Sequence, residues 1–291
     1  MKKLLQGVTL VLAIIVISSP ANAFDLNSTE DSNQDGVSDS NTTSLGGNPF
    51  ITIEPASILI DRAHSGDFNV GGLVEFLLSQ GWTVDELYNP VTPEALAAYD
   101  VYLIPTKIGT NAGIDSYSED EALAVMAFVE DGNGLWCLAE YNGDQTGVNS
   151  VANQFGIDFQ SSTITDPVDN IDGHQSWPLI TLIEPHPISE GVSAFGYIAG
   201  CCVETSAPST VLATGGPNAS SAECPDFPPV LSVYENGGRA VFCGDITPFY
   251  PGFDITEEHW LMLANTAEWL AVNQSVETED MSWGNIKTLY R

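Results

Sequence analysis

Between residues 55 and 272 strand-like and helix-like segments alternate, and this alternation constrains the fold more than any other feature. The strand-like runs are short and apolar, and they lie at 57–61, 82–84, 101–105, 135–139, 179–183, 211–213, 230–233 and 240–243. Apolar residues at helical spacing fill most of the intervals, at 70–78, from 92, at 118–129, 149–155 and 256–271. Such alternation is typical of βαβ units, so the sequence predicts an α/β domain with a largely parallel sheet.

Several helix ends carry recognisable signals. Ser118 stands three residues before Glu121, which is the spacing of a capping box. Thr92 precedes Pro93, a favourable pair for a helix start because Thr caps the free N–H groups and proline suits the first turn. The residues between 160 and 230 are rich in turn formers and predict a less regular region.

The N-terminus has the organisation of a secretory signal peptide. Lys2 and Lys3 precede the apolar run 10–17, and Ala21-Asn22-Ala23 is a small-residue cleavage signature. An uncleaved membrane anchor is the alternative, but the apolar run is short for a membrane span. We therefore predict a signal peptide at 1–23, a chain that begins at Phe24, and a secreted, periplasmic or cell-surface protein with a bacterial-type signal.

The chain is strongly acidic, and this charge limits its partners. Seven basic residues oppose 39 acidic ones in the whole sequence, and removal of Lys2 and Lys3 leaves a net charge of −34. Such a surface repels phosphate backbones and anionic membranes, so nucleic-acid binding is excluded and cationic or neutral ligands are favoured. A general solubilising role of the charge is the alternative interpretation. No apolar stretch after the signal peptide is long enough for a transmembrane segment.

Residues 24–54 read as an acidic linker that contains a calcium-type loop. Oxygen-bearing side chains alternate in this loop, a glycine follows at position 36, and the expected ligands are Asp31, Asn33, Asp35 and Asp39. The segment resembles a thrombospondin type 3-like or EF-hand-type calcium loop. It departs from an EF-hand because the twelfth position is Thr42 rather than a bidentate glutamate. A flexible acidic linker is the alternative interpretation.

The five cysteines allow disulfides if the protein is exported. Cys201 or Cys202 is expected to pair with Cys224 and so close a loop rich in Ser, Pro and Gly. Cys137 and Cys243 lie in apolar strand-like runs, where small buried core residues are the simplest interpretation. The odd count leaves at least one free thiol or an intermolecular bond.

A series of short phrases within 55–272 resembles one family. They are Ile58-Leu59-Ile60-Asp61-Arg62-Ala63-His64, Tyr99-Asp100-Val101-Tyr102-Leu103-Ile104-Pro105, Gly132-Asn133-Gly134-Leu135-Trp136-Cys137-Leu138, Asn153-Gln154-Phe155-Gly156-Ile157-Asp158-Phe159, His186-Pro187-Ile188-Ser189-Glu190-Gly191-Val192 and Gly237-Gly238-Arg239-Ala240-Val241-Phe242-Cys243-Gly244-Asp245. Together they are similar to class I glutamine amidotransferase-like domains of the DUF4350, GldG and intraflagellar-transport-52 type. The resemblance implies a flavodoxin-like, largely parallel sheet with helices on both faces. Members of this group are mostly uncharacterised or act in assemblies.

The catalytic residues of active amidotransferases do not carry over to this sequence. Those enzymes place their cysteine in a tight G-x-C-x-G turn after a strand, whereas Cys137 sits inside a strand-like run between Trp136 and Leu138. The downstream His-x-Glu of the family is also missing from the sequence. We therefore interpret Cys137 as structural.

Four polar residues follow the predicted strands and are candidates for a site. They are Asp61 and His64 after the first strand, Glu140 after the fourth, and Asp245 after the last. Ligands of open parallel sheets bind beyond the carboxyl ends of the strands, so these four could form one crevice that binds a divalent cation or supports acid–base hydrolysis. The alternative is that they cap helices or bind loop amides, with Asp61 paired to Arg62 or Arg239. His259, in the first turn of the last helix, is expected to face solvent.

Two functions remain open from the sequence. The first is an exported non-catalytic α/β module that binds an unknown ligand or protein partner and binds calcium through residues 31–39. The second is a secreted hydrolase of glycan or peptide that uses Asp61, His64, Glu140 and Asp245. The tail 273–291 ends in the basic and aromatic segment 283–291, which suits either a sorting or docking signal or a frayed terminus.

Overall fold

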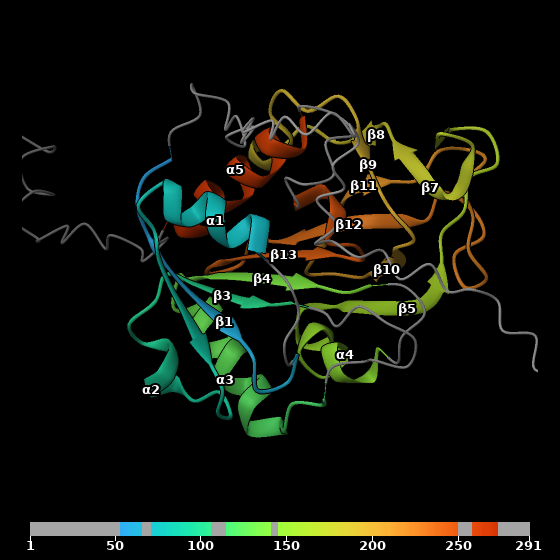
Figure 1. The fold of residues 1–291 in the computed structure, drawn as a ribbon. Coiled ribbons are helices and arrows are strands. Elements are labelled where there is room, and N and C mark those ends of the chain that lie inside the picture. The colour runs from blue at the N-terminus through green and yellow to red at the C-terminus, as the bar shows by residue number, and fades with distance from the viewer. Residues whose placement is uncertain (1–52, 66–70, 106–114, 141–144, 250–257, 273–291) are drawn as a thin grey trace, which may run out of the picture. The chain divides into compact units, whose positions relative to one another are not determined.

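The centre of the computed structural model is an eight-stranded sheet in the order β2-β1-β3-β4-β13-β12-β11-β8 (Figure 1). Its strands are β1 (Ser57–Asp61), β2 (Thr83–Leu87), β3 (Val101–Ile104), β4 (Gly134–Leu138), β8 (Leu182–Ile183), β11 (Thr210–Thr214), β12 (Pro229–Tyr234) and β13 (Arg239–Cys243). The first five in the spatial order are parallel to one another, and the last three are antiparallel to their neighbours. The parallel part has the flavodoxin-like order, so the predicted fold class is confirmed.

The structure describes residues 53–65, 71–105, 115–140, 145–249 and 258–272. All of them belong to one structural unit. The predicted signal peptide, the calcium-type loop 31–39 with nearly all of the acidic linker, and the C-terminal tail 273–291 lie outside the described residues.

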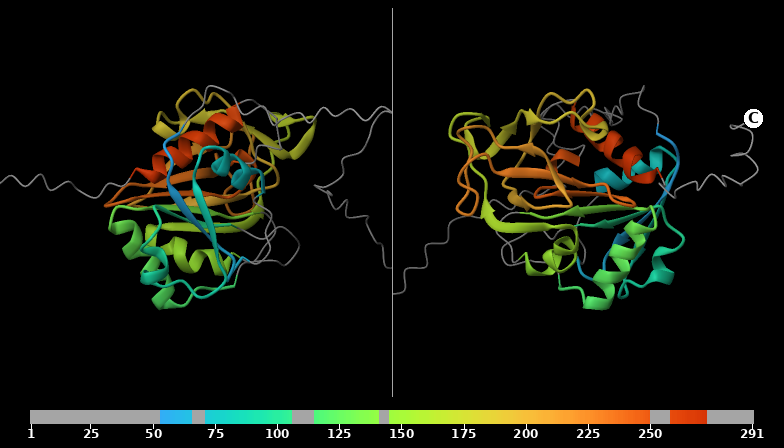
Figure 2. Two further views of the ribbon diagram at one scale, coloured as in Figure 1. Left: turned by 60° about the vertical axis from the view of Figure 1, so that its left-hand side comes forward. Right: turned by 180° about the vertical axis from the view of Figure 1, so that it is seen from behind.

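Helices cover both faces of the parallel strands (Figures 1 and 2). On one face lie α1 (Gly71–Ser79) and α5 (Glu258–Ala271), and on the other lie α2 (Pro93–Leu96), α3 (Glu119–Glu130) and α4 (Thr146–Ala152). Each face has its own apolar cluster: Ile58, Ile60 and Trp136 pack on the side of α1 and α5, whereas Leu59 and Cys137 pack on the side of α3 and α4. This double burial explains why the parallel strands read as continuous apolar runs.

Local signals place the helices on the second face. Ser118 accepts a hydrogen bond from the backbone N–H of Glu121, and the Glu121 carboxylate accepts one from the N–H of Ser118, which completes the predicted capping box of α3. Thr92 caps α2 by accepting a hydrogen bond from Ala95 N. The capping box also holds the Glu121 side chain beside the carboxyl end of β1, where the candidate residues Asp61 and His64 lie.

The region predicted to be less regular contains two small antiparallel sheets. One pairs β5 (Ile157–Thr163) with β10 (Cys201–Thr205), and the other orders β6 (Asn170–Ile171), β7 (His174–Ile180) and β9 (Phe195–Gly196). Short 3₁₀ segments join the elements at η1 (Asn153–Phe155), η2 (Pro187–Ser189) and η3 (Thr247–Phe249). The strands β5 and β10 escaped the sequence analysis because β5 is largely polar and half exposed. The predicted run 179–183 is in fact divided between β7 and β8.

One disulfide links Cys202 to Cys224, as one of the two expected pairings had it. Cys137, Cys201 and Cys243 are free and buried. The disulfide closes a loop with a sequence separation of 22 residues and ties β10 to the turn-rich segment before β12. Across the described ranges, no helix is both long enough and apolar enough to cross a membrane.

Removing the disulfide should weaken the fold by a calculable amount. Closing a loop of this length limits the unfolded chain, so the double variant Cys202→Ala/Cys224→Ala should lower the free energy of unfolding by about 3 kcal/mol. Urea unfolding followed by tryptophan fluorescence measures the change. Wild-type protein unfolded in a reducing agent should match the double variant, and the reducing agent should leave the double variant unchanged. Equal stability of reduced and oxidised wild type would contradict the prediction.

Candidate functional site

Asp61 is fully buried at the carboxyl end of β1 and binds the loop that follows it. Its Oδ1 accepts hydrogen bonds from the N–H groups of Ala63 at 2.9 Å and His64 at 3.3 Å. Its main-chain carbonyl accepts a further bond from the Ser65 hydroxyl. Asp61 therefore satisfies loop amides, which is one of the alternatives that the sequence left open.

Neither arginine considered as a partner of Asp61 pairs with it. The guanidinium of Arg62 binds Oε1 of Glu86 through Nε at 3.0 Å and Nη2 at 2.7 Å. Arg239 donates to the main-chain carbonyl of Trp269 at 2.6 Å and lies over the ring of that residue. The charge partner of Asp61 is instead His64.

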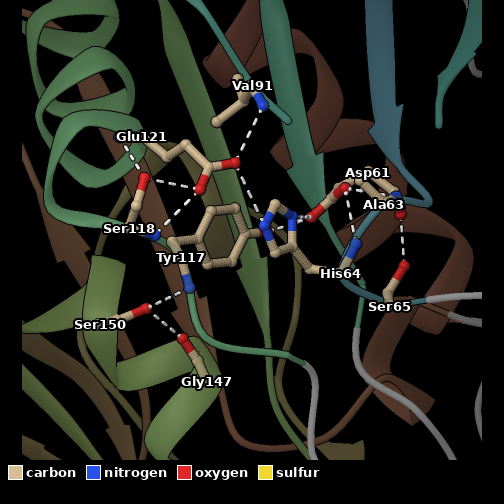
Figure 3. A network of polar contacts seen from close by, with 10 residues as sticks. All are labelled: Asp61, Ala63, His64, Ser65, Val91, Tyr117, Ser118, Glu121, Gly147 and Ser150. Carbon is tan, nitrogen blue, oxygen red and sulfur yellow. Dashed lines mark hydrogen bonds and ion pairs between the residues drawn. The ribbon is translucent and has the colours of Figure 1, made fainter. Parts of the chain in front are cut away.

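The His64 imidazole bridges two carboxylates (Figure 3). Its Nδ1 lies 3.0 Å from Asp61 Oδ2, and its Nε2 lies 3.2 Å from Glu121 Oε1. The Tyr117 ring stacks on the imidazole with centroids 3.8 Å apart, and the Tyr117 hydroxyl donates to Asp61 Oδ2. We call Asp61, His64, Tyr117 and Glu121 the His64 bridge. It connects the end of β1 to the start of α3.

Hydrogen bonds with two further segments and with the N-cap of α3 hold the bridge in place. Oε1 of Glu121 also accepts from Val91 N at 3.1 Å, and its Oε2 accepts from the Ser118 hydroxyl at 2.7 Å. The N–H of Tyr117 donates to the Ser150 hydroxyl of α4 at 3.0 Å. The bridge therefore fastens four segments of the chain at one edge of the sheet.

The charges around His64 favour its protonated form. Burial lowers the pKa of the imidazole, but the hydrogen bond and charge of Asp61 and the charges of Glu121 and Asp115 outweigh burial, so the pKa is raised above its usual value. Burial also acts against the ionised form of Glu121, yet bonds from Ser118 and the charge of His64 lower its pKa. An imidazolium donates from both nitrogens and has no lone pair to accept a proton, so in this state His64 cannot act as a general base.

Asp245 and Glu140 form a second buried group. Oδ1 of Asp245 accepts from the N–H of Thr247 at 2.9 Å and from its hydroxyl at 2.8 Å, and Oδ2 accepts from Ile198 N. Burial raises the pKa of Asp245 to about 7, because it outweighs these hydrogen bonds. Glu140 is 5% exposed. Burial raises the pKa values of Tyr197 and Cys201, and the charges of Glu140 and Asp245 add to this effect.

The structure does not bring the four predicted residues into one crevice. Strands β3 and β4 separate β1 from β13, which places the ends of β1 and β13 about 14 Å apart. Asp61 contacts Tyr117, which belongs to the apolar cluster on the side of α3 and α4. Asp245 lies beside Tyr197, which belongs to the cluster on the side of α1 and α5. The sequence order located the residues at strand ends but did not determine which face each side chain takes.

The described residues offer little support for a shared metal site at these positions. Within them, no group of three or more His, Cys, Asp or Glu side chains is arranged to hold a metal ion. A shallow depression of about 150 Å³ involves Glu54, Asp100 and Glu268. It borders the beginning of β1, at the opposite end of the strand from Asp61.

Other predictions for single residues have mixed outcomes. The Cys137 side chain is fully buried in β4, and burial raises the pKa of its thiol far above the usual value, as a structural cysteine requires. His259 does not face solvent as expected: it is 1% exposed, and its Nε2 accepts a hydrogen bond from Gly196 N at 2.9 Å. It packs under the strand β9, which the sequence analysis did not recognise.

Two members of the His64 bridge were missed as site residues. Glu121 was identified only as a helix cap, and Tyr117 carried no signal beyond its place beside Ser118. Tyr102 of β3 is a related case, because its fully buried hydroxyl lies near Asp61, whose charge adds to burial in raising the pKa of this phenol. A buried tyrosine hydroxyl usually needs a hydrogen-bond partner. A tyrosine in an apolar strand, next to a strand that ends in a carboxylate, could therefore have indicated that Tyr102 lies near Asp61.

Comparisons with known proteins identify the fold alone. No family model matches the sequence, and no curated protein matches it. Among solved structures, the mmIFT52 N-terminal domain is similar with a TM-score of 0.62 and 17% identity, over 75% of this chain and 98% of that chain. A glutamine amidotransferase from Methylobacillus flagellatus has a TM-score of 0.44 and 10% identity, over 76% of this chain and 94% of that chain. The finer placement in a DUF4350 or GldG group stays a prediction.

The bridge predicts a specific loss when His64 is replaced. His64→Gln removes the cation between two carboxylates, one of them fully buried, and should lower the free energy of unfolding at pH 5.5 by about 3 kcal/mol. Urea unfolding measures the effect. His174→Gln, at an exposed position in β7, is the matched control and should change stability little.

The loss should also depend on pH in a defined direction. Because the pKa of His64 is raised in the folded protein, its stabilising contribution is fully present below the unfolded pKa of about 6.5 and disappears as pH rises through the folded pKa. The stability difference between wild type and His64→Gln should therefore shrink between pH 5.5 and pH 9. A difference that grows with pH would contradict the assignment of His64 as the cation of the bridge.

Proposed function

We propose that this chain is an exported, non-catalytic module that binds a ligand or protein partner of cationic or neutral character. The observation that carries the proposal is the His64 bridge. It lies at the carboxyl end of β1, next to β3, where the order of a flavodoxin-like sheet reverses and where such folds commonly bind ligands. Here the side chains at that position bind one another.

The chemistry of the remaining candidates supports the same conclusion. The amidotransferase-type nucleophile would have to be Cys137, and its thiol is buried inside β4 with a strongly raised pKa. Asp61 binds loop amides and His64, and the nitrogens of His64 both face carboxylates. A buried network of this kind stabilises the loops at the edge of the sheet, which suits a rigid binding platform.

The charge of the chain indicates the character of the partner. Of its seven basic residues, only Arg62 and Arg239 fall in the described part, and they contact Glu86 and Trp269. The acidic excess attracts cationic surfaces at long range and repels nucleic acid. The similarity to the mmIFT52 N-terminal domain concerns the fold and does not name the partner.

The calcium-type loop is the second part of the proposal. Asp31, Asn33, Asp35 and Asp39 provide oxygen ligands at alternating positions around a glycine turn. A single loop without a paired neighbour suits weak binding, of the order of 10⁻⁴ to 10⁻³ M, as in extracellular calcium modules. The acidic linker would then become ordered only in a calcium-rich medium.

A secreted hydrolase remains the second candidate because of one observation. Asp245 has a pKa of about 7, so near neutral pH it can donate a proton, and Glu140 lies in the same buried group. Glycoside hydrolysis uses a pair of carboxyl groups, one of which donates a proton. Asp61 and His64 lie at the end of β1, which β3 and β4 separate from the strand that precedes Asp245.

An activity assay separates the two candidates. The purified protein should release no product above a blank from a panel of nitrophenyl glycosides and from fluorescently labelled casein. The variants Asp245→Asn and Glu140→Gln are assayed in parallel. Hydrolysis by the wild type that falls by 100-fold or more in either variant would establish the hydrolase and overturn the non-catalytic module.

The calcium loop is tested by spectroscopy on the whole protein. Titration with calcium to 5 mM should shift the backbone NMR signals of residues 31–39, because ligation orders the loop. The double variant Asp31→Asn/Asp35→Asn should lose these shifts, whereas Asp25→Asn in the same linker should retain them. Unchanged signals in the wild type at millimolar calcium would refute the loop.

A further inference from the structure

Asp166 presents a buried carboxylate oxygen without a partner. The residue is 1% exposed, and its Oδ1 accepts hydrogen bonds from Val168 N and Asp169 N, both at 2.8 Å. Its Oδ2 is buried and has no hydrogen-bond partner among the described residues. A buried carboxylate oxygen in native proteins is nearly always hydrogen-bonded or bound to a cation, so this one needs an explanation.

A second carboxylate faces the same space. A Cβ atom placed on Gly216 would lie 3.7 Å from Asp166 Oδ2 and 3.9 Å from Asp169 Oδ2. The two oxygens therefore lie on one small region next to a residue that has no side chain to fill it. Asp169 is exposed, so this region is open to solvent on one side.

The chain offers little positive charge to neutralise this pair. The basic residues of the described part are Arg62 and Arg239, and their guanidinium groups contact Glu86 and Trp269. Two neighbouring carboxylates, one of them buried, repel each other unless a cation lies between them. Within the part of the chain that the structure describes, both basic side chains are engaged elsewhere, so a cation from the medium can take this place.

We propose that Asp166 and Asp169 bind a divalent cation, calcium, beside Gly216. Calcium accepts carboxylate oxygens together with main-chain oxygens and water, and it tolerates irregular geometry. Two carboxylates balance its charge, and the open side at Asp169 admits the waters that complete its coordination. Magnesium is disfavoured because it requires a near-ideal octahedron and dehydrates reluctantly.

The position of this site indicates what the ion does. Asp166 and Asp169 belong to the turn between β5 and β6, and Gly216 belongs to the turn after β11. The backbones of these segments already pair between Thr165 and Ser220, through two hydrogen bonds of 2.9 Å. The ion would lie between the same two segments as this pair, and Gly216 belongs to the loop closed by the Cys202–Cys224 disulfide. This inference is independent of the calcium loop at 31–39 and of the proposed binding function.

The test is the calcium dependence of thermal unfolding in the purified protein. Calcium at 100 times its dissociation constant should raise the melting temperature of the wild type by about 5–10 °C relative to EDTA. Asp166→Asn keeps the oxygen that accepts from Val168 and Asp169 but removes the charge. It should abolish this rise, and in EDTA it should melt at a higher temperature than the wild type because the unpaired buried charge is gone.

Two controls separate this site from other effects of calcium. Asp172→Asn makes the same charge change at an exposed position six residues from Asp166 and should keep the full rise. Asp31→Asn/Asp35→Asn disables the predicted N-terminal loop and should also keep it. Isothermal titration should show one fewer bound calcium in Asp166→Asn than in the wild type.

Two results would overturn the inference. The first is an equal calcium-induced rise in the wild type and in Asp166→Asn, which would place the ion elsewhere. The second is a lower melting temperature of Asp166→Asn in EDTA, with no calcium effect on either protein, which would mean that Oδ2 is satisfied by water only.

Discussion

Burial of both faces of the parallel strands is the constraint on which the rest of this structure depends. Every residue of β3 and β4 is buried, and β1 and β13 are buried after their first residue. Polar side chains can therefore occur along these strands only where the strands end. The buried polar side chains of the parallel strands therefore gather at the carboxyl edge of the sheet. Which face of the sheet each side chain takes depends on the direction in which the last residues of its strand point.

The sequence predicted the features of this arrangement that depend on neighbouring residues, but not those that depend on contacts between distant parts of the chain. Strand runs, the Ser118–Glu121 capping box and the strand-end position of Asp61 depend on neighbours within a few residues, and all were recovered. The contact of Asp61 with Tyr117 was not, because Tyr117 lies 56 residues away along the chain and reaches Asp61 only through packing of α3 on the sheet. The assumption of one crevice failed for the same reason: sequence order places a residue at a strand end, but the spatial strand order and the face are set by tertiary packing.

The strands β5 and β10 show a different limit. Their residues do not form apolar runs, since one side of β5 is exposed and the Cys201–Cys202 pair at the start of β10 falls among turn formers. Their pairing is defined by each other, from Ile157 with Thr205 to Thr163 with Cys201. The local pattern of apolar residues does not indicate which distant strand a segment pairs with. Regions built from short antiparallel pairs are therefore the hardest to predict from sequence.

An acidic chain with few basic residues must stabilise its buried carboxylates by other means, and this protein uses several. Asp61 relies on amide donors, a tyrosine hydroxyl and the His64 imidazolium. Asp245 relies on amide and hydroxyl donors and on a pKa that allows it to be neutral near pH 7. For the Oδ2 atom of Asp166, the described ranges of the chain supply no hydrogen-bond partner. Burial of an uncompensated carboxylate opposes folding, and the proposed calcium ion would compensate the third residue. The ionic composition of the medium would then be part of what stabilises the fold.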